Sequence, residues 1–105
     1  MKSKDTMKTY KSFEEEKEEK EKEILKLLGK EIARKRNTEK LSQAQLGELC
    51  DLDTTTIWRI ENGHINSKFL NVIKIILELD IDMLDLKDEI KKILKLEGDG
   101  ENNDD

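Results

Sequence analysis

Hydrophobic residues along this chain recur at intervals of three and four, the spacing that places side chains on one face of an α-helix. In the first such stretch, Leu25, Leu28 and Ile32 share a face. No segment alternates apolar and polar residues as a half-buried strand does, so we expect an all-α fold of five short helices around one core. The pattern predicts helices over residues 24–36, 43–50, 54–62 and 68–79, a brief fifth helix over residues 83–86, and a last apolar stripe formed by Ile90, Ile93 and Leu94.

Residues that commonly start or end helices mark the boundaries of these segments. Ser42, Asp53 and Ser67 can each cap the helix that follows, because their side-chain oxygens accept hydrogen bonds from free backbone N–H groups. Gly63 and Gly98 are expected to end the third helix and the last stripe. The fourth helix is expected to carry an apolar stripe made of Phe69, Leu70, Ile73, Ile76 and Leu77.

A charged segment precedes the first apolar stripe. Ser12 and Glu15 have the spacing of a capping box, so we expect a helix to begin there. Residues 14–23 hold no apolar side chain, which predicts a solvated helix supported by pairs such as Glu16 with Lys20. The chain is thus expected to divide into a charged extension (1–23, disordered over 1–11), a helical domain (24–86), a C-terminal helix (87–98) and a disordered acidic tail (99–105).

Two of the predicted helices, 43–50 and 54–62, are joined by a very short turn. Gly47 is expected to lie where they cross, because a residue without a side chain lets two helices approach closely. Asp51 occupies the turn position that usually needs a left-handed backbone, which aspartate tolerates at modest cost. The inner side of the crossing is expected to consist of Leu46, Leu49, Leu52, Ile57 and Ile60. Such an arrangement is a helix-turn-helix.

Composition excludes several classes of protein. The 105 residues are 43% charged and 34% hydrophobic and contain no proline, which fits one small domain with charged flanks. Cys50, the single cysteine, is expected in the core, and with the single histidine, the surface residue His64, it can form neither a disulfide nor a zinc site. We therefore expect no cofactor, no catalytic constellation and a reducing, cytoplasmic setting. No run approaches the ~20 apolar residues that a membrane span requires, so no membrane partner is expected.

Charge is distributed unevenly along the chain. The formal net charge is -5, which by itself argues weakly against a nucleic-acid partner. Residues 24–40, however, carry six basic and two acidic side chains, a balance of +4. Residues 41–65 carry one basic and four acidic side chains, a balance of -3. A positive face is therefore compatible with the negative total, and it is expected outside the helix-turn-helix itself.

Residues 25–86 resemble the XRE-like helix-turn-helix class that includes Cro and the phage repressors. The residues that match the class pattern are Leu28, Gly29, Ile32, Arg36, Ser42, Gln43, Leu46, Gly47, Leu49, Ile57, Glu61, Asn62 and Gly63. The resemblance implies a five-helix, λ-repressor-like domain, here with an extended charged N-terminal helix and a short C-terminal helix. Two positions depart from the class: Asp51 replaces the turn glycine, and Lys40 stands where a glycine commonly ends the first helix.

The resemblance implies that helix 54–62 is the recognition helix, which lies in the major groove of double-stranded DNA. Its exposed side is expected to carry Thr54, Thr55, Trp58, Arg59 and Asn62. Arg59 is the best candidate to read a base, because its guanidinium can donate two hydrogen bonds to a guanine; a phosphate contact is the alternative. Thr54, Thr55 and Thr56 offer hydroxyls and methyls to phosphates or thymine edges, or serve as helix-start residues.

Three further positions have roles implied by the resemblance or left open by it. Gln43 matches the glutamine that bonds a phosphate, although a first-turn backbone contact is an alternative. Arg36 and Glu61 match a pair that joins the first helix to the third and fixes geometry. Trp58 could pack on a thymine methyl or sugar, cover a partner surface, or lie over neighbouring side chains of its own domain.

The last apolar stripe, to which Leu86 also belongs, is relevant to the oligomeric state of the protein. It either folds back as extra core or pairs with its twin in a second copy, and we favour the homodimer, which would set the separation of two DNA half-sites. These interpretations predict a dimeric, sequence-specific regulator of a bacterium or its mobile elements, most simply a repressor, and not an enzyme. The alternatives are an antitoxin whose disordered flank binds a protein partner, the toxin, and a protein-interaction module that has lost DNA binding.

Overall fold

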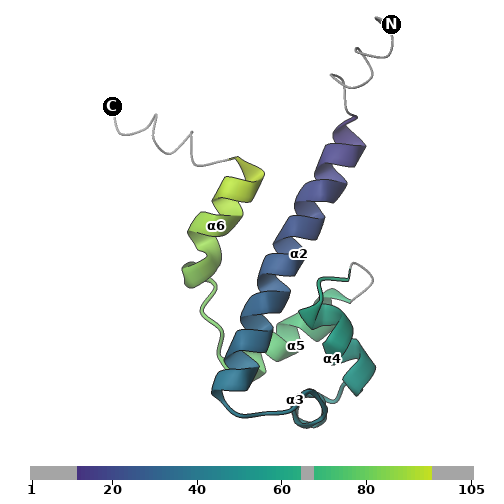
Figure 1. Ribbon diagram of the computed structural model, residues 1–105, viewed down its shortest axis with the longest axis vertical. Helices are drawn as coiled ribbons and strands as arrows, with labels where there is room; N and C mark the ends of the chain where they lie inside the picture. Colours follow the sequence, from purple (N-terminus) through teal and green to yellow (C-terminus); the bar gives the residue numbers. More distant parts are fainter. Residues whose placement is uncertain (1–11, 65–67, 96–105) are drawn as a thin grey trace, which may run out of the picture.

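The computed structural model describes residues 12–64 and 68–95, and helices are the only regular elements within these ranges. The prediction of an all-α fold is confirmed. The helices are α2 (Phe13–Thr38), α3 (Gln43–Cys50), α4 (Thr54–Glu61), α5 (Phe69–Leu79) and α6 (Leu84–Leu94), and Figure 1 shows α3, α4 and α5 gathered at one end of the long helix α2. The predicted disordered start and acidic tail lie outside the described residues, as do Ser67 and Gly98.

Helix α2 combines the charged extension and the first helix of the domain in one element. It has 26 residues and so is about 39 Å long. The predicted capping box is present: Glu15 N donates to Ser12 Oγ at 3.1 Å, and Ser12 N donates to Glu15 Oε1 at 3.3 Å. The charged first half, which has exposed side chains, projects away from α3 and α4 (Figure 1).

Left-handed residues other than glycine end most of the described helices or their turns. Lys40 (φ 60°), Asp51 (φ 60°), Asp80 (φ 55°) and Lys95 (φ 61°) all adopt this conformation. The two departures from the class pattern, at residues 40 and 51, therefore keep the backbone geometry that glycine usually supplies, at a modest conformational cost. Because Lys95 ends α6, the helix stops before the predicted end at residue 98.

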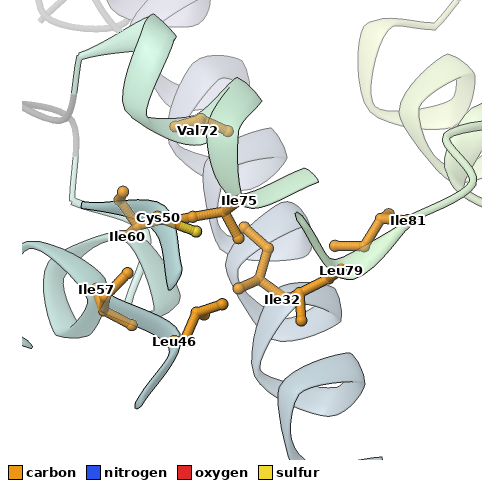
Figure 2. Packing of buried hydrophobic residues seen from close by; sticks show 9 residues of the cluster. All are labelled: Ile32, Leu46, Cys50, Ile57, Ile60, Val72, Ile75, Leu79 and Ile81. Carbon is orange, nitrogen blue, oxygen red and sulfur yellow. The ribbon is translucent and has the colours of Figure 1, made fainter. Parts of the chain in front are cut away.

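The core lies between α2, α3, α4 and α5 (Figure 2). Its buried members are Ile32, Leu46, Cys50, Ile57, Ile60, Val72, Ile75, Leu79 and Ile81. Cys50 is buried among them as predicted, and burial raises the pKa of its thiol. Within the described residues no buried side-chain nitrogen or oxygen lacks a hydrogen-bond partner, so the core carries no unsatisfied polar group.

Several apolar residues predicted to be buried are exposed instead. Leu49 is 53% exposed and Leu77 is 74% exposed, and Phe69 and Leu70 are exposed as well. Helix α5 has apolar residues on nearly all sides, so its spacing alone did not decide which side faces inward. The side that the tertiary structure buries is centred on Val72, Ile75 and Leu79. The predicted stripe was therefore wrong for Phe69, Leu70 and Leu77, whereas Ile73 is half-buried and Ile76 packs against the core.

The C-terminal apolar residues belong to one helix that packs along α2. The prediction of a short helix over 83–86 followed by a separate stripe was wrong, because α6 runs without a break through both segments. Leu86 is buried, and Ile90 and Ile93 are half-buried. Since α6 contacts α2, the structure supports the alternative in which this stripe folds back on its own domain, rather than the favoured pairing with a second copy.

Candidate nucleic-acid interface

The turn between α3 and α4 is closed by a contact between Gly47 and Leu52. The N–H of Leu52 donates to the carbonyl of Gly47 at 2.8 Å. A Cβ on Gly47 would collide with the carbonyl oxygen of Leu52, so only glycine fits. Gly47 was predicted to lie where two helices cross. That prediction was wrong, because the backbone close to Gly47 belongs to the turn at Leu52. The turn is tight because Asp51 is left-handed and the chain reverses within three residues.

Both helices of the motif begin at capped residues. Ser42 and Gln45 form a reciprocal capping box at the start of α3. At the start of α4, Asp53 Oδ1 accepts a hydrogen bond from Thr56 N at 2.7 Å. The hydroxyl and the backbone N–H of Thr56 stabilise the ionised carboxylate, which lowers the pKa of Asp53 below its ordinary value. Thr56 is thereby engaged at the helix start and is half-buried, whereas Thr54 and Thr55 are exposed.

The close crossing of two helices occurs at Gly29 of α2 rather than at Gly47. A Cβ on Gly29 would lie 2.5 Å from the carbonyl oxygen of Ile60 and 2.6 Å from that of Glu61. The last turn of α4 therefore rests directly on the backbone of α2. The sequence predicted Gly29 as a residue that matches the class pattern, but it predicted no contact for Gly29. No local pattern distinguishes a glycine that faces another helix from one that faces solvent.

A buried carboxylate joins α2, α3 and α4. Glu61 accepts two hydrogen bonds from Arg36, Nε to Oε2 at 2.6 Å and Nη2 to Oε1 at 3.0 Å. Gln43 Nε2 donates to Glu61 Oε1 at 2.9 Å, and Arg36 Nη1 donates to the carbonyl of Leu41 at 2.7 Å. The side chains of Arg36 and Glu61 are only 12% and 5% exposed. The ion pair and its neighbouring hydrogen bonds join α2, α3 and α4. They thereby fix the angle of α4 relative to the other two helices.

Gln43 takes part in this network, which bears on its suggested phosphate contact. Its amide nitrogen carries two donors, and one of them bonds Glu61. The second donor and the side-chain carbonyl make no hydrogen bond with a described residue, and the side chain is half-buried. Gln43 is therefore oriented by the same carboxylate that positions α4.

The outward side of α4 carries the residues predicted for it. Thr54, Thr55, Trp58, Arg59 and Asn62 are exposed, while Ile57 and Ile60 point into the core. The backbone carbonyl of Arg59 accepts hydrogen bonds from Asn62 and His64. The guanidinium of Arg59 makes no hydrogen bond or ion pair with any residue of ranges 12–64 and 68–95, so it is available to a ligand. Asn62 Nδ2 donates to the carbonyl of Trp58 at 2.8 Å, which engages part of its amide at the end of the helix.

Trp58 lies beside His64, which was expected at the surface. The ring of His64 meets the indole edge-on, with ring centroids 5.3 Å apart. The indole remains 48% exposed. Of the three alternatives for Trp58, the contact within its own domain is therefore present, and the exposed half of the ring remains available for another contact.

Comparison with known protein families matches the helix-turn-helix family over residues 32–86, more than half of the chain. The chain belongs to the XRE-type helix-turn-helix family of DNA-binding regulatory proteins. Searches of curated proteins and of solved structures found no match. The matched range begins at the buried Ile32 and ends at the buried Leu86, so it includes α3, α4 and α5 whole, the C-terminal part of α2 and the first residues of α6.

Charge around this helix-turn-helix is divided between the two ends of α4. Of the four acidic residues counted in the segment, Glu61 is buried and paired with Arg36. Glu48, Asp51 and Asp53 are exposed and lie near the start of α4. Arg59 lies in the last turn of the same helix. The exposed side of α4 is thus acidic near its start and basic in its last turn, rather than acidic throughout.

Within residues 12–64 and 68–95, no three His, Cys, Asp or Glu side chains are arranged to bind a metal ion. None of the helices in these ranges combines the length and the apolar character that crossing a bilayer requires.

Proposed function

We propose that this protein is a sequence-specific transcriptional regulator that inserts α4 into the major groove of DNA. The observation that carries the proposal is the unpaired, exposed guanidinium of Arg59 on a helix held by the buried Glu61. A rigid helix of this kind fits the major groove, where guanine presents two acceptors to a planar donor. We assign Arg59 to a base and Gln43 to a phosphate. Thr54, Thr55 and the exposed half of Trp58 are assigned to the flanking phosphates, sugars or thymine methyls.

Replacing Arg59 by alanine tests the assignment. Duplexes bound by the wild-type protein are selected from random DNA, and the selection is repeated with Arg59→Ala. We expect the variant to lose the preference for guanine at one position of each half-site and to bind the wild-type sequence with affinity lower by about 1–3 kcal/mol.

The matched control is Arg34→Ala. Arg34 is an exposed arginine of α2 that bonds Glu31 and does not belong to the α4 surface. Its loss removes the same charge, so it lowers affinity for all sequences alike and leaves the selected sequence unchanged. If Arg59→Ala selects the same sequence as the wild type, base reading by this residue is excluded.

We further propose that the regulator is a repressor that occupies its promoter as a homodimer. Two copies bound to two half-sites double the base contacts, which compensates for the few cations near α4. The apolar face available for pairing is formed by the exposed Leu49 of α3 and Leu77 of α5. With Cys50, Lys74 and Glu78 these residues line a shallow hollow of about 280 Å³. In a two-fold pair, Lys74 of each copy can meet Glu78 of the other, so the face is complementary to itself.

Leu77→Asp tests this pairing. The substitution places a charge on a residue that is 74% exposed, so the monomer stays folded while the paired state loses its apolar contact. We expect sedimentation to change from a dimer to a monomer and operator affinity to fall at least tenfold. Leu84→Asp, at an exposed leucine of α6, is the control and leaves the dimer intact. A dimer that persists in Leu77→Asp would exclude this face.

A further inference from the structure

A hollow lies between the middle of α2 and the end of the recognition helix. It measures about 360 Å³ and is lined by Lys26, Lys30, Glu61 and Asn62. The two lysines are four residues apart on α2 and therefore share one face of that helix. Both are exposed, and neither forms an ion pair with a residue of the described ranges. Two free ammonium groups thus border one side of the hollow.

The backbone holds these lysines next to α4. Gly29, which lies between them on α2, lets the last turn of α4 approach to contact distance. The turn after α4 is equally close, because a Cβ on Gly63 would lie 2.9 Å from Lys26 Cγ and 3.0 Å from Lys26 Cα. The positive φ of Gly63, 74°, permits this approach. The position of the lysines relative to the recognition helix is therefore set by two glycine contacts.

The charge in the hollow is that of the two lysines. Glu61 lines it but is 5% exposed, and its carboxylate is already occupied by Arg36 and Gln43. Asn62 contributes a neutral amide. The opposite end of α4 carries the exposed acids Asp51 and Asp53. The two lysines therefore give the hollow a positive potential that attracts an anion.

We propose that Lys26 and Lys30 bind two successive backbone phosphates of one DNA strand beside the last turn of α4. The inference rests on the proposed function, since it requires α4 to lie in the groove. It places one strand of the DNA beside the last turn of the recognition helix, next to α2. Residues of α2 thereby supply the attraction that the helix-turn-helix lacks.

The experiment measures the salt dependence of binding to the selected duplex for the wild type and for Lys26→Gln/Lys30→Gln. Glutamine keeps most of the stem that packs over Gly63 while removing the charge. Each lost phosphate contact lowers the slope of log affinity against log salt by ~0.9, so we expect a decrease of about 1.8 with an unchanged selected sequence and melting temperature. The control, Lys17→Gln/Lys20→Gln, removes two charges from the first half of α2, on other sides of the helix than Lys26 and Lys30, and changes the slope little.

The outcomes separate this inference from the proposed function. A wild-type protein that selects a sequence, combined with equal slopes for the two double variants, overturns the phosphate site and leaves base reading by α4 intact. A wild-type protein that selects no sequence overturns both. A changed sequence preference in Lys26→Gln/Lys30→Gln also overturns the inference, because phosphate contacts carry no base information.

Discussion

Replacing Glu61 by alanine is expected to lower the free energy of unfolding by about 3 kcal/mol, the range seen when one partner of a buried ion pair is removed. Arg36, only 12% exposed, would keep its charge without the carboxylate that bonds it twice. Gln43 would lose its acceptor as well. In a domain of this size the loss corresponds to a fall in melting temperature of roughly 10–20 °C, measured by thermal and chemical unfolding.

A second ion pair of similar geometry provides the control. Arg34 bonds Glu31 through two nitrogens, at 3.0 and 2.6 Å, but its side chain is 61% exposed. Glu31→Ala should therefore cost much less than Glu61→Ala, because water replaces the lost carboxylate. Combining Glu61→Ala with Arg36→Ala is expected to recover part of the loss, since no buried charge then remains unpaired. Equal melting temperatures for Glu61→Ala and the wild type would contradict the role of this carboxylate.

Replacing Gly29 by alanine is expected to destabilise the domain by about 3 kcal/mol, the upper part of the range for an overpacked core. The added methyl would lie 2.5 and 2.6 Å from two backbone oxygens of α4, and neither can move aside by a side-chain rotation. Helix α4 must then shift on α2, which strains the bonds between Arg36 and Glu61. Denaturant titration measures the loss, and the DNA affinity of the folded fraction is expected to fall with it.

Ala33→Gly, four residues further along α2, is the control that distinguishes the effect of this steric clash on stability from the effect of helix propensity. Alanine is favoured over glycine inside a helix by ~1 kcal/mol, so propensity alone would make Gly29→Ala stabilising and Ala33→Gly destabilising. We expect both substitutions to destabilise. A Gly29→Ala protein more stable than the wild type would show that α2 and α4 can separate without cost.

Local signals allowed much of the fold to be predicted from the sequence. Capping boxes depend on residues three positions apart, so those of Ser12 and Ser42 are readable from the chain. Asp53 caps α4 for the same reason. The left-handed turn at Asp51 follows from its place between two helices and the need for a tight reversal.

Features that depend on distant parts of the chain were harder to predict from the sequence. The apolar pattern of α5 is nearly continuous around the helix, so only its neighbours determine that Ile75 is buried and Leu77 exposed. Leu49 was placed inside because it shares a helix with Leu46, but the core does not extend to its side of α3. The hollow beside Lys26 arises from two glycine contacts between segments more than 30 residues apart, and no local pattern indicates it.

Methylation interference on the selected duplex tests most directly whether α4 reads the major groove. One methylating reagent modifies N7 of guanine, which lies in the major groove, and N3 of adenine, which lies in the minor groove. We predict that N7 methylation of a guanine in each half-site prevents binding of the wild-type protein and that Arg59→Ala is no longer sensitive at that guanine. Interference confined to adenine N3 would place the protein in the minor groove and contradict the assignment of α4 as the recognition helix.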